Sequence, residues 1–158
     1  MNYRFVTTWQ IEAPLQAVCD AICAPQGWPA WWRNVEQVEE IAPGDTRGIG
    51  GVRRYTWRGR LPYRLTFDIR VTRHEPLAVV EGIATGDVEG RGCWSFASEG
   101  TITSVRYEWQ VRTTRPWMNA LAMFARPVIE WNHNAVMQQG GIALAHKLNA
   151  RLVKIFHT

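Results

Sequence analysis

The sequence predicts an α+β domain in which a curled antiparallel sheet is closed by one long C-terminal helix. Three observations support this fold class. Most segments between residues 3 and 114 alternate apolar and polar residues, as strands with one buried face do. Short turns rather than helical crossovers separate these segments, so neighbouring strands should pair antiparallel. Segment 117–156 instead repeats its apolar residues with the period of a helix.

The length and composition limit the possible classes of protein. A chain of 158 residues is long enough for one domain, residues 1–158, with a core that needs no disulfide or metal. Its net charge of +4 comes from arginines scattered among acids, so we expect no nucleic-acid binding. The three cysteines lack redox or zinc-site spacing, which favours a reduced, cytoplasmic setting. No segment is apolar enough for stable membrane insertion.

The first part of the chain predicts a strand followed by two short helices. Residues 3–12 alternate cleanly, and Pro14 then suits the first turn of a helix over residues 15–22. Residues 26–32 hold three tryptophans between Gly and Pro and predict a second short helix. A return strand should begin at Val35.

Five further strands are expected between residues 51 and 114, which brings the sheet to seven. In the first of them we expect Tyr55 and Trp57 to pack inward. The cleanest alternation predicts that two sets of side chains face the same interior volume. The strands are 51–58, 63–72, 77–85, 88–98 and 101–114, and the inward sets are Leu65, Phe67, Ile69 and Val71, and Val105, Tyr107, Trp109 and Val111.

The C-terminal segment predicts one long helix with a single buried face. Because Pro127 lacks an amide hydrogen, a break or kink is expected near residues 124–126. At 100° per residue one apolar line runs along the helix, with three polar residues along its edge. The line contains Leu121, Phe124, Val128, Trp131, Ala135, Ile142 and Asn149, and the edge contains Asn132, Gln139 and His146.

No side-chain pattern predicts a metal site or a cofactor. The four histidines lie in separate elements, no G-x-S-x-G occurs, and the glycine-rich residues 48–51 precede a strand rather than a helix. Asp68 and Glu108 should face outward with arginine partners. The alternation leaves Glu81 and Arg54 ambiguous, and an inward acid with an inward arginine would suit an aldol-type cyclisation.

The aromatic residues are the best candidates for a binding site. They either pack together as core or line a cavity, and the polar tips among them favour a cavity. The candidate ligand-binding residues are Trp9, Tyr55, Phe67, Trp94, Tyr107, Trp109, Val128, Trp131, Asn132, Ala135 and Gln139.

Several short motifs accompany this order of elements: residues 11–14 (IEAP), 31–32 (WW), 86–90 (GDVEG), 107–109 (YEW), 114–118 (TRPWM) and 131–133 (WNH). Together they resemble the START-like (SRPBCC) superfamily with its helix-grip fold, and locally its bacterial polyketide cyclase/dehydrase-type members. The resemblance implies a seven-stranded sheet that grips the C-terminal helix around a hydrophobic cavity. It does not imply one reaction, because the superfamily includes both carriers and cyclases.

Three functions remain open from the sequence. The first is binding or carriage of a hydrophobic small molecule that is lipid-, polyketide- or isoprenoid-like. The second is a polyketide cyclase or dehydratase that acts on a similar ligand. The third is an interaction module that uses exposed aromatics of residues 28–32 as its contact surface.

Overall fold

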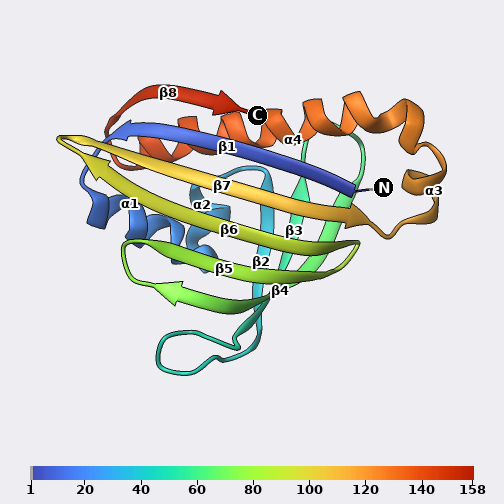
Figure 1. Ribbon diagram of the computed structural model, residues 1–158, viewed down its shortest axis with the longest axis horizontal. Helices are drawn as coiled ribbons and strands as arrows, with labels where there is room; N and C mark the ends of the chain where they lie inside the picture. Colours follow the sequence, from blue (N-terminus) through green and yellow to red (C-terminus); the bar gives the residue numbers. More distant parts are fainter. Residues whose placement is uncertain (1) are drawn as a thin grey trace.

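Eight antiparallel strands form one sheet that curls around the longest helix (Figure 1). The computed structural model describes residues 2–158, with the backbone alone at residue 122. The strand order is β2-β3-β4-β5-β6-β7-β1-β8. The strands are β1 (Asn2–Glu12), β2 (Val35–Ala42), β3 (Val52–Arg58), β4 (Arg64–Glu75), β5 (Val79–Gly86), β6 (Val88–Glu99), β7 (Ile102–Thr113) and β8 (Arg151–His157). The helices are α1 (Leu15–Ile22), η1 (Pro25–Gly27), α2 (Trp28–Trp31), α3 (Pro116–Ala120) and α4 (Ala122–Lys147).

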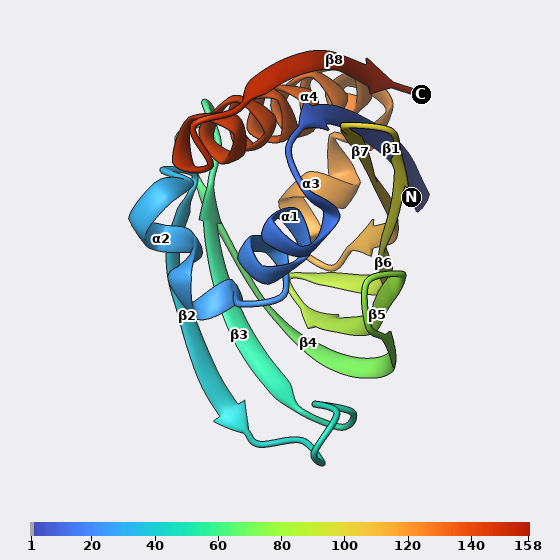
Figure 2. The same cartoon turned by 90° about the vertical axis from the view of Figure 1, so that its left-hand side faces the viewer.

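Figure 2 looks along the hollow of the sheet and shows α4 lying across its open side. The predicted fold class, a curled antiparallel sheet with a long C-terminal helix and short helices after the first strand, is confirmed. The register follows from the alternating burial of side chains in strands such as β6 and β7. Phe67 of β4 lies opposite Tyr55 of β3, for example, and both are buried.

The predicted C-terminal helix extends too far, because its last residues form β8. The helix ends at Lys147, and Asn149 then takes the left-handed conformation at φ 49°. The amide of Ala150 donates to the carbonyl of Ala145 at 2.9 Å, which is the backbone bond of a helix C-terminal cap. The chain reverses there, and β8 pairs antiparallel with β1 as an eighth strand.

The predicted break at residues 124–126 is also displaced. Helix α3 ends at Ala120, Leu121 separates the two helices, and α4 runs through Pro127. Pro127 is exposed in the second turn of α4 rather than at a boundary.

The buried face of α4 is not the predicted one. Trp131 is 50% exposed and Phe124 is 81% exposed, and an Arg60 guanidinium lies 5.7 Å from the centre of the Trp131 ring. Of the predicted line, Leu121, Val128 and Ile142 are exposed as well. At 100° per residue, the buried residues of α4 lie on average nearly half a turn from the predicted line. Three of them are Gly or Ala, and the set is Asn132, Met137, Gly140, Gly141, Leu144 and Ala145.

Trp9 of β1 and Trp32, which directly follows α2, hold α4 against the sheet. The Trp9 indole N–H donates to the carbonyl of Met137 at 3.0 Å, and that of Trp32 donates to the carbonyl of Val136 at 3.2 Å. The two rings meet at 5.7 Å. Trp28 and Trp32 are both buried, so the segment 28–32 does not present these two rings as an exposed contact surface.

Candidate ligand cavity

Two adjoining cavities lie between the curled sheet and α4. The first, cavity 1, has a volume of about 140 Å³ and is bounded by η1, α2 and strands β3 to β7. The second, cavity 2, has a volume of about 110 Å³ and lies nearer α3 and the start of β1. Each volume is far larger than one water needs. The two cavities adjoin, since both are lined by Trp57, Phe67, Tyr107 and Met137.

Seven aromatic residues belong to the wall of cavity 1. Trp94 stacks on Tyr107 at 4.2 Å, and Trp28 lies 5.7 Å from Tyr55. Polar groups enter at one end through Arg53 of β3 and His74 of β4. The cavity therefore combines large apolar surface with a few polar groups, as small-molecule sites do.

The polar residues that line cavity 2 are uncharged, whereas cavity 1 is lined in part by arginines. The side-chain oxygen of Asn132 accepts a hydrogen bond from the amide of Arg60 at 2.8 Å, which fixes the Asn132 amide at the cavity wall. His133 stacks on Phe5 with the ring centres 4.1 Å apart. Tyr3 and Tyr63 complete this polar side.

Unsatisfied polar atoms gather around these cavities. Five buried side-chain nitrogen or oxygen atoms of the described residues lack a hydrogen-bond partner, and four of them belong to cavity-lining residues. Buried polar groups normally have partners, so such a cluster indicates where a bound molecule could supply them. The four atoms are Tyr3 Oη, Arg53 Nε, Trp57 Nε1 and His133 Nδ1.

Burial keeps two tyrosines and one histidine of the cavity walls neutral. It raises the pKa of Tyr55 to about 12, and it also raises the pKa of Tyr107. It lowers the pKa of His133 to about 4, although a hydrogen bond to Asn134 opposes this shift. At neutral pH the two tyrosines are hydroxyl donors and His133 is an uncharged imidazole.

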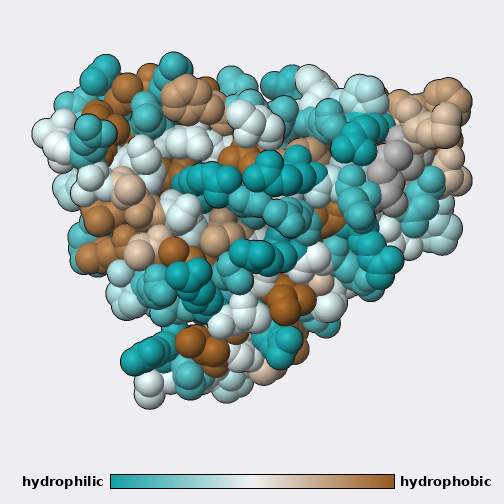
Figure 3. Space-filling model, viewed as in Figure 1, coloured by the Kyte–Doolittle hydropathy of each residue, from teal (hydrophilic) through white to brown (hydrophobic). Residues whose placement is uncertain are grey.

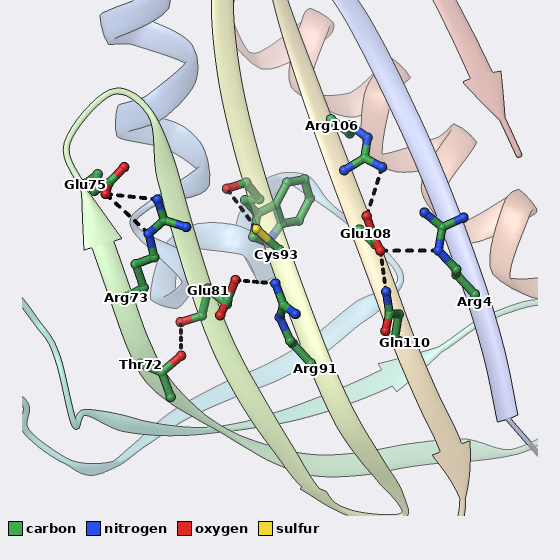
Figure 4. Close-up of polar contacts among 11 residues, drawn as sticks. Arg4, Thr72, Arg73, Glu75, Glu81, Arg91, Cys93, Arg106, Glu108 and Gln110 are labelled. Carbon is green, nitrogen blue, oxygen red and sulfur yellow. Dashed lines mark hydrogen bonds and ion pairs between the residues drawn. The ribbon is translucent and has the colours of Figure 1, made fainter.

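The carboxylates considered from the sequence lie on the outer face of the sheet (Figure 4). Glu108 contacts Arg4 at 3.3 Å and Arg106 at 2.8 Å. Hydrogen bonds from Gln110 and then Arg106 lower the pKa of Glu108. Glu81 contacts Arg91 at 2.7 Å.

Arg54, whose orientation the sequence left open, also lies on the outer face of the sheet. It forms a two-pronged contact with Asp68 at 2.8 and 3.1 Å, on the outer face. The outward orientation predicted for Asp68 and Glu108 is confirmed, and Glu81 and Arg54 share it.

The structure brings together some of the eleven candidate residues and separates the others. Tyr55, Phe67, Trp94 and Tyr107 line cavity 1. Phe67 and Tyr107 also line cavity 2, together with Trp109 and Asn132. Trp9 lies behind Trp94 as core, 5.6 Å away. The remaining four lie on other faces of α4 and line neither cavity: Val128, Trp131, Ala135 and Gln139.

Sequence reasoning missed several residues of the lining. Arg53 has the same strand parity as Tyr55 and Trp57, so the inward assignment of those two rings already implied it. Met137 and His133 required the correct helix phase. Trp28 required the path of α2 over the sheet, for which the sequence carries no periodic signal.

An exposed apolar surface lies at the end of the molecule formed by α3 and the start of α4 (Figure 3). Met123 and Phe124 are each 81% exposed, and Trp117 packs edge-on against Tyr63 at 5.5 Å. Within residues 2–158, no helix is long and apolar enough to cross a membrane. Across the same residues, no group of three or more His, Cys, Asp or Glu side chains could hold a metal ion.

Comparison with known proteins places the chain in a family. Among solved structures, the chain resembles the Zhui aromatase/cyclase from a Streptomyces species, with a TM-score of 0.77 and 16% identity over 94% of each chain. It also resembles a START superfamily protein from Mycobacterium smegmatis, with a TM-score of 0.75 and 11% identity over 93% of this chain and 98% of the other. A third similar structure is TTHA0849 from Thermus thermophilus, with a TM-score of 0.72 and 17% identity over 92% of this chain and 99% of the other.

The TM-scores over most of each chain establish a shared fold. No curated protein matches the chain significantly. The family model described as "Polyketide cyclase / dehydrase and lipid transport" matches residues 11–138. This match runs from the last residues of β1 through most of α4 and includes residues that line both cavities. The chain therefore belongs to the polyketide cyclase/dehydrase and lipid transport family.

Proposed function

We propose that this protein binds one hydrophobic small molecule in cavities 1 and 2 and acts as a binding or carrier protein. The ligand would be flat or elongated and of a lipid-, polyketide- or isoprenoid-like class. Its apolar body would contact the shared wall of Trp57, Phe67, Tyr107 and Met137. Its polar groups would pair with the unpartnered polar atoms around the two cavities.

One observation carries this proposal: four of the five unpartnered buried polar atoms belong to residues around two adjoining aromatic cavities. A core that evolved only for packing would pair or exclude such atoms, because each unpaired one costs about 1 to 3 kcal/mol. A ligand with apolar surface and a few polar groups removes that cost. Family membership supports the same conclusion, since the family's description includes lipid transport.

A second candidate is a polyketide cyclase or dehydratase. Aldol-type cyclisation needs a base that removes a proton next to a carbonyl and a donor that stabilises the oxyanion formed when the enolate carbon attacks. Arg53 is a donor on the wall of cavity 1, and neutral His133 on the wall of cavity 2 could accept a proton. Glu81 and Glu108 form ion pairs with arginines on the outer face, so an enzymatic function would depend on Arg53 and His133. Binding without chemistry is therefore the simpler function.

A probe titration with two matched variants tests the binding proposal. Val136 lines cavity 2 and its neighbour Ala135 lines neither cavity, so Val136→Phe should fill space that Ala135→Leu leaves open. We expect the parent and Ala135→Leu to bind the fluorescent probe 1-anilinonaphthalene with a stoichiometry of about one per chain. Val136→Phe should bind the same probe at least about tenfold more weakly. Thermal melts of all three proteins check that the fold survives.

Two results would count against the proposal. If the parent protein does not bind the probe, the aromatic set is core. If both variants bind as the parent does, the probe occupies another place.

A further inference from the structure

Cavity 1 carries positive charge on its inner wall. Arg53 lies opposite Ile69 in the β3–β4 register, and Ile69 lines cavity 1, so the Arg53 side chain leaves β3 on the cavity face. Its Nε is buried and has no hydrogen-bond partner. Arg54, the next residue along the strand, points to the other face and pairs with Asp68.

No acid neutralises this charge inside the cavity. Among the ion pairs of residues 2–158, none involves Arg53 or Arg47, the second arginine on the lining. Glu81 also belongs to the lining, but its carboxylate is engaged by Arg91 on the outer face (Figure 4). Glu40 lies opposite Arg53 in the β2–β3 register, yet it is exposed and forms no ion pair with it.

A histidine adds a further polar group on the same side. His74 lies opposite Val80, another residue of the cavity wall, and its Nδ1 is 2.7 Å from the carbonyl oxygen of Arg47. A carbonyl only accepts, so Nδ1 carries the hydrogen and donates to it. In the neutral ring Nε2 is then an acceptor, which suits a hydrogen-bond donor of the ligand rather than its anionic group.

We propose that cavity 1 recognises an anionic group, so that the ligand is an amphipathic organic anion such as an aromatic or isoprenoid carboxylate. The anion pairs with the Arg53 guanidinium, and the Tyr55 hydroxyl is the neighbouring neutral donor. The apolar body runs along Trp57, Phe67 and Tyr107 toward cavity 2. This inference rests on the proposed binding function and narrows its ligand class.

The physical reason is the balance between desolvation and pairing. A guanidinium turned toward a cavity loses hydration, which costs free energy. A charge-assisted hydrogen bond to an anion offsets this cost more effectively than a hydrogen bond to a neutral group. An apolar wall beside it lowers the local dielectric and strengthens the attraction. A neutral hydrocarbon would leave Arg53 Nε unpaired and gain only the burial of its apolar surface.

Two fluorescent probes that differ by one charge test this inference. They are 1-anilinonaphthalene and its 8-sulfonate, which share the same ring system. We expect the parent protein to bind the sulfonate at least about tenfold more tightly. Arg53→Gln should abolish this preference while leaving the affinity for the neutral probe nearly unchanged.

Three control variants make the assignment specific. Arg54→Gln removes the same charge from the outer face and should leave both affinities as in the parent. Arg53→Lys keeps a charge without the Nε donor and should retain part of the preference, which also covers the case in which Arg53→Gln folds poorly. Phe124→Ser removes an exposed ring from the α3–α4 end and should change neither affinity, because the probes bind inside.

The outcomes separate this inference from the proposed function. Equal affinity of the parent for both probes, or a preference that survives Arg53→Gln, would overturn the anionic ligand class while leaving hydrophobic binding intact. Failure of the parent to bind either probe would overturn both. An equal loss of preference in Arg54→Gln would show that general surface charge attracts the sulfonate, and would overturn the role of Arg53.

Discussion

Trp9 and Trp131 differ sharply in environment although both were candidates from the sequence. Trp9 is 1% exposed and its indole donates to the backbone of α4, whereas Trp131 is 50% exposed. We expect Trp9→Ala to lower the free energy of unfolding by about 3 to 5 kcal/mol, because it opens a cavity and leaves the Met137 carbonyl without this donor. Trp131→Ala should cost less than about 1 kcal/mol. Urea denaturation measures both, and losses of similar size would contradict the observed orientation of α4.

The His133 imidazole makes stability depend on pH. Its pKa falls from 6.5 to about 4 in the folded protein, so between these values the unfolded chain binds the proton more readily. The stability contributed by burying the neutral ring is complete above pH 6.5 and is lost as the pH falls toward 4, with a slope of up to about 1.4 kcal/mol per pH unit.

A variant without an ionisable ring tests that slope. We expect His133→Phe to lose less stability than the parent between pH 6.5 and 4 in denaturant melts, because the ring no longer binds a proton. His146→Asn, a change at an exposed histidine, should behave as the parent does. Identical pH dependence in the parent and His133→Phe would mean that His133 titrates normally. His157 also has a pKa lowered by burial, and it remains in both variants, so its own titration contributes to both melts.

Individual strand residues were predictable because strand parity leaves only two choices. Leu65, Phe67 and Ile69 share one parity and all line a cavity. Arg53 followed from the same rule once Tyr55 was assigned inward. A helix offers a continuous range of orientations instead, and an error in phase moved Trp131 from the interior to the surface.

At the scale of elements, α4 was misoriented because its buried face carries little apolar signal. Gly140 packs against Trp32 and Gly141 against Trp9, and neither glycine contributes a side chain. A Cβ on Gly141 would lie 2.9 Å from Trp9 Cδ1. The exposed start of the helix carries large apolar residues such as Met123 and Phe124. A periodicity search follows side-chain size and therefore favours the wrong face.

The close approach at Gly140 gives a test of this packing. A Cβ there would overlap the buried Trp32 ring, so Gly140→Ala should destabilise the fold by about 1 to 3 kcal/mol. Helix propensity alone predicts a stabilisation of about 1 kcal/mol for the same change. The exposed neighbour provides the control, because Gln138→Ala should be nearly neutral. A stabilised Gly140→Ala protein in chemical denaturation would show that α4 does not pack on Trp32.

Strand β8 was missed because it is short and follows a helix directly. Asn149 is the signal that could have revealed the boundary, since Asn is one of the few residues that tolerate the left-handed conformation at a helix end. The residues beyond it pair with β1 at the edge of the sheet. That pairing depends on tertiary placement, which local sequence does not encode.

At the scale of the whole molecule, the order of elements carried most of the predictable information. Strands joined by short turns can only form an antiparallel sheet, and a sheet of this size with one long helix encloses a volume between them. The location of the cavities was harder to predict, because it depends on how far each ring reaches from its backbone. Trp28 and Met137 enter the lining from α2 and α4, which approach the sheet independently.

The central claim is that the protein binds one apolar ligand internally, and its tryptophans report on this directly. The chain has nine of them, and their indole N–H groups give separate signals in two-dimensional NMR. Trp28, Trp57 and Trp94 line cavity 1, whereas Trp117 and Trp131 are exposed on α3 and α4. On titration with 1-anilinonaphthalene, we predict saturable shifts of the first three signals at one ligand per chain, with the last two unchanged. Shifts confined to Trp117 and Trp131, or no shifts at all, would contradict an internal binding site.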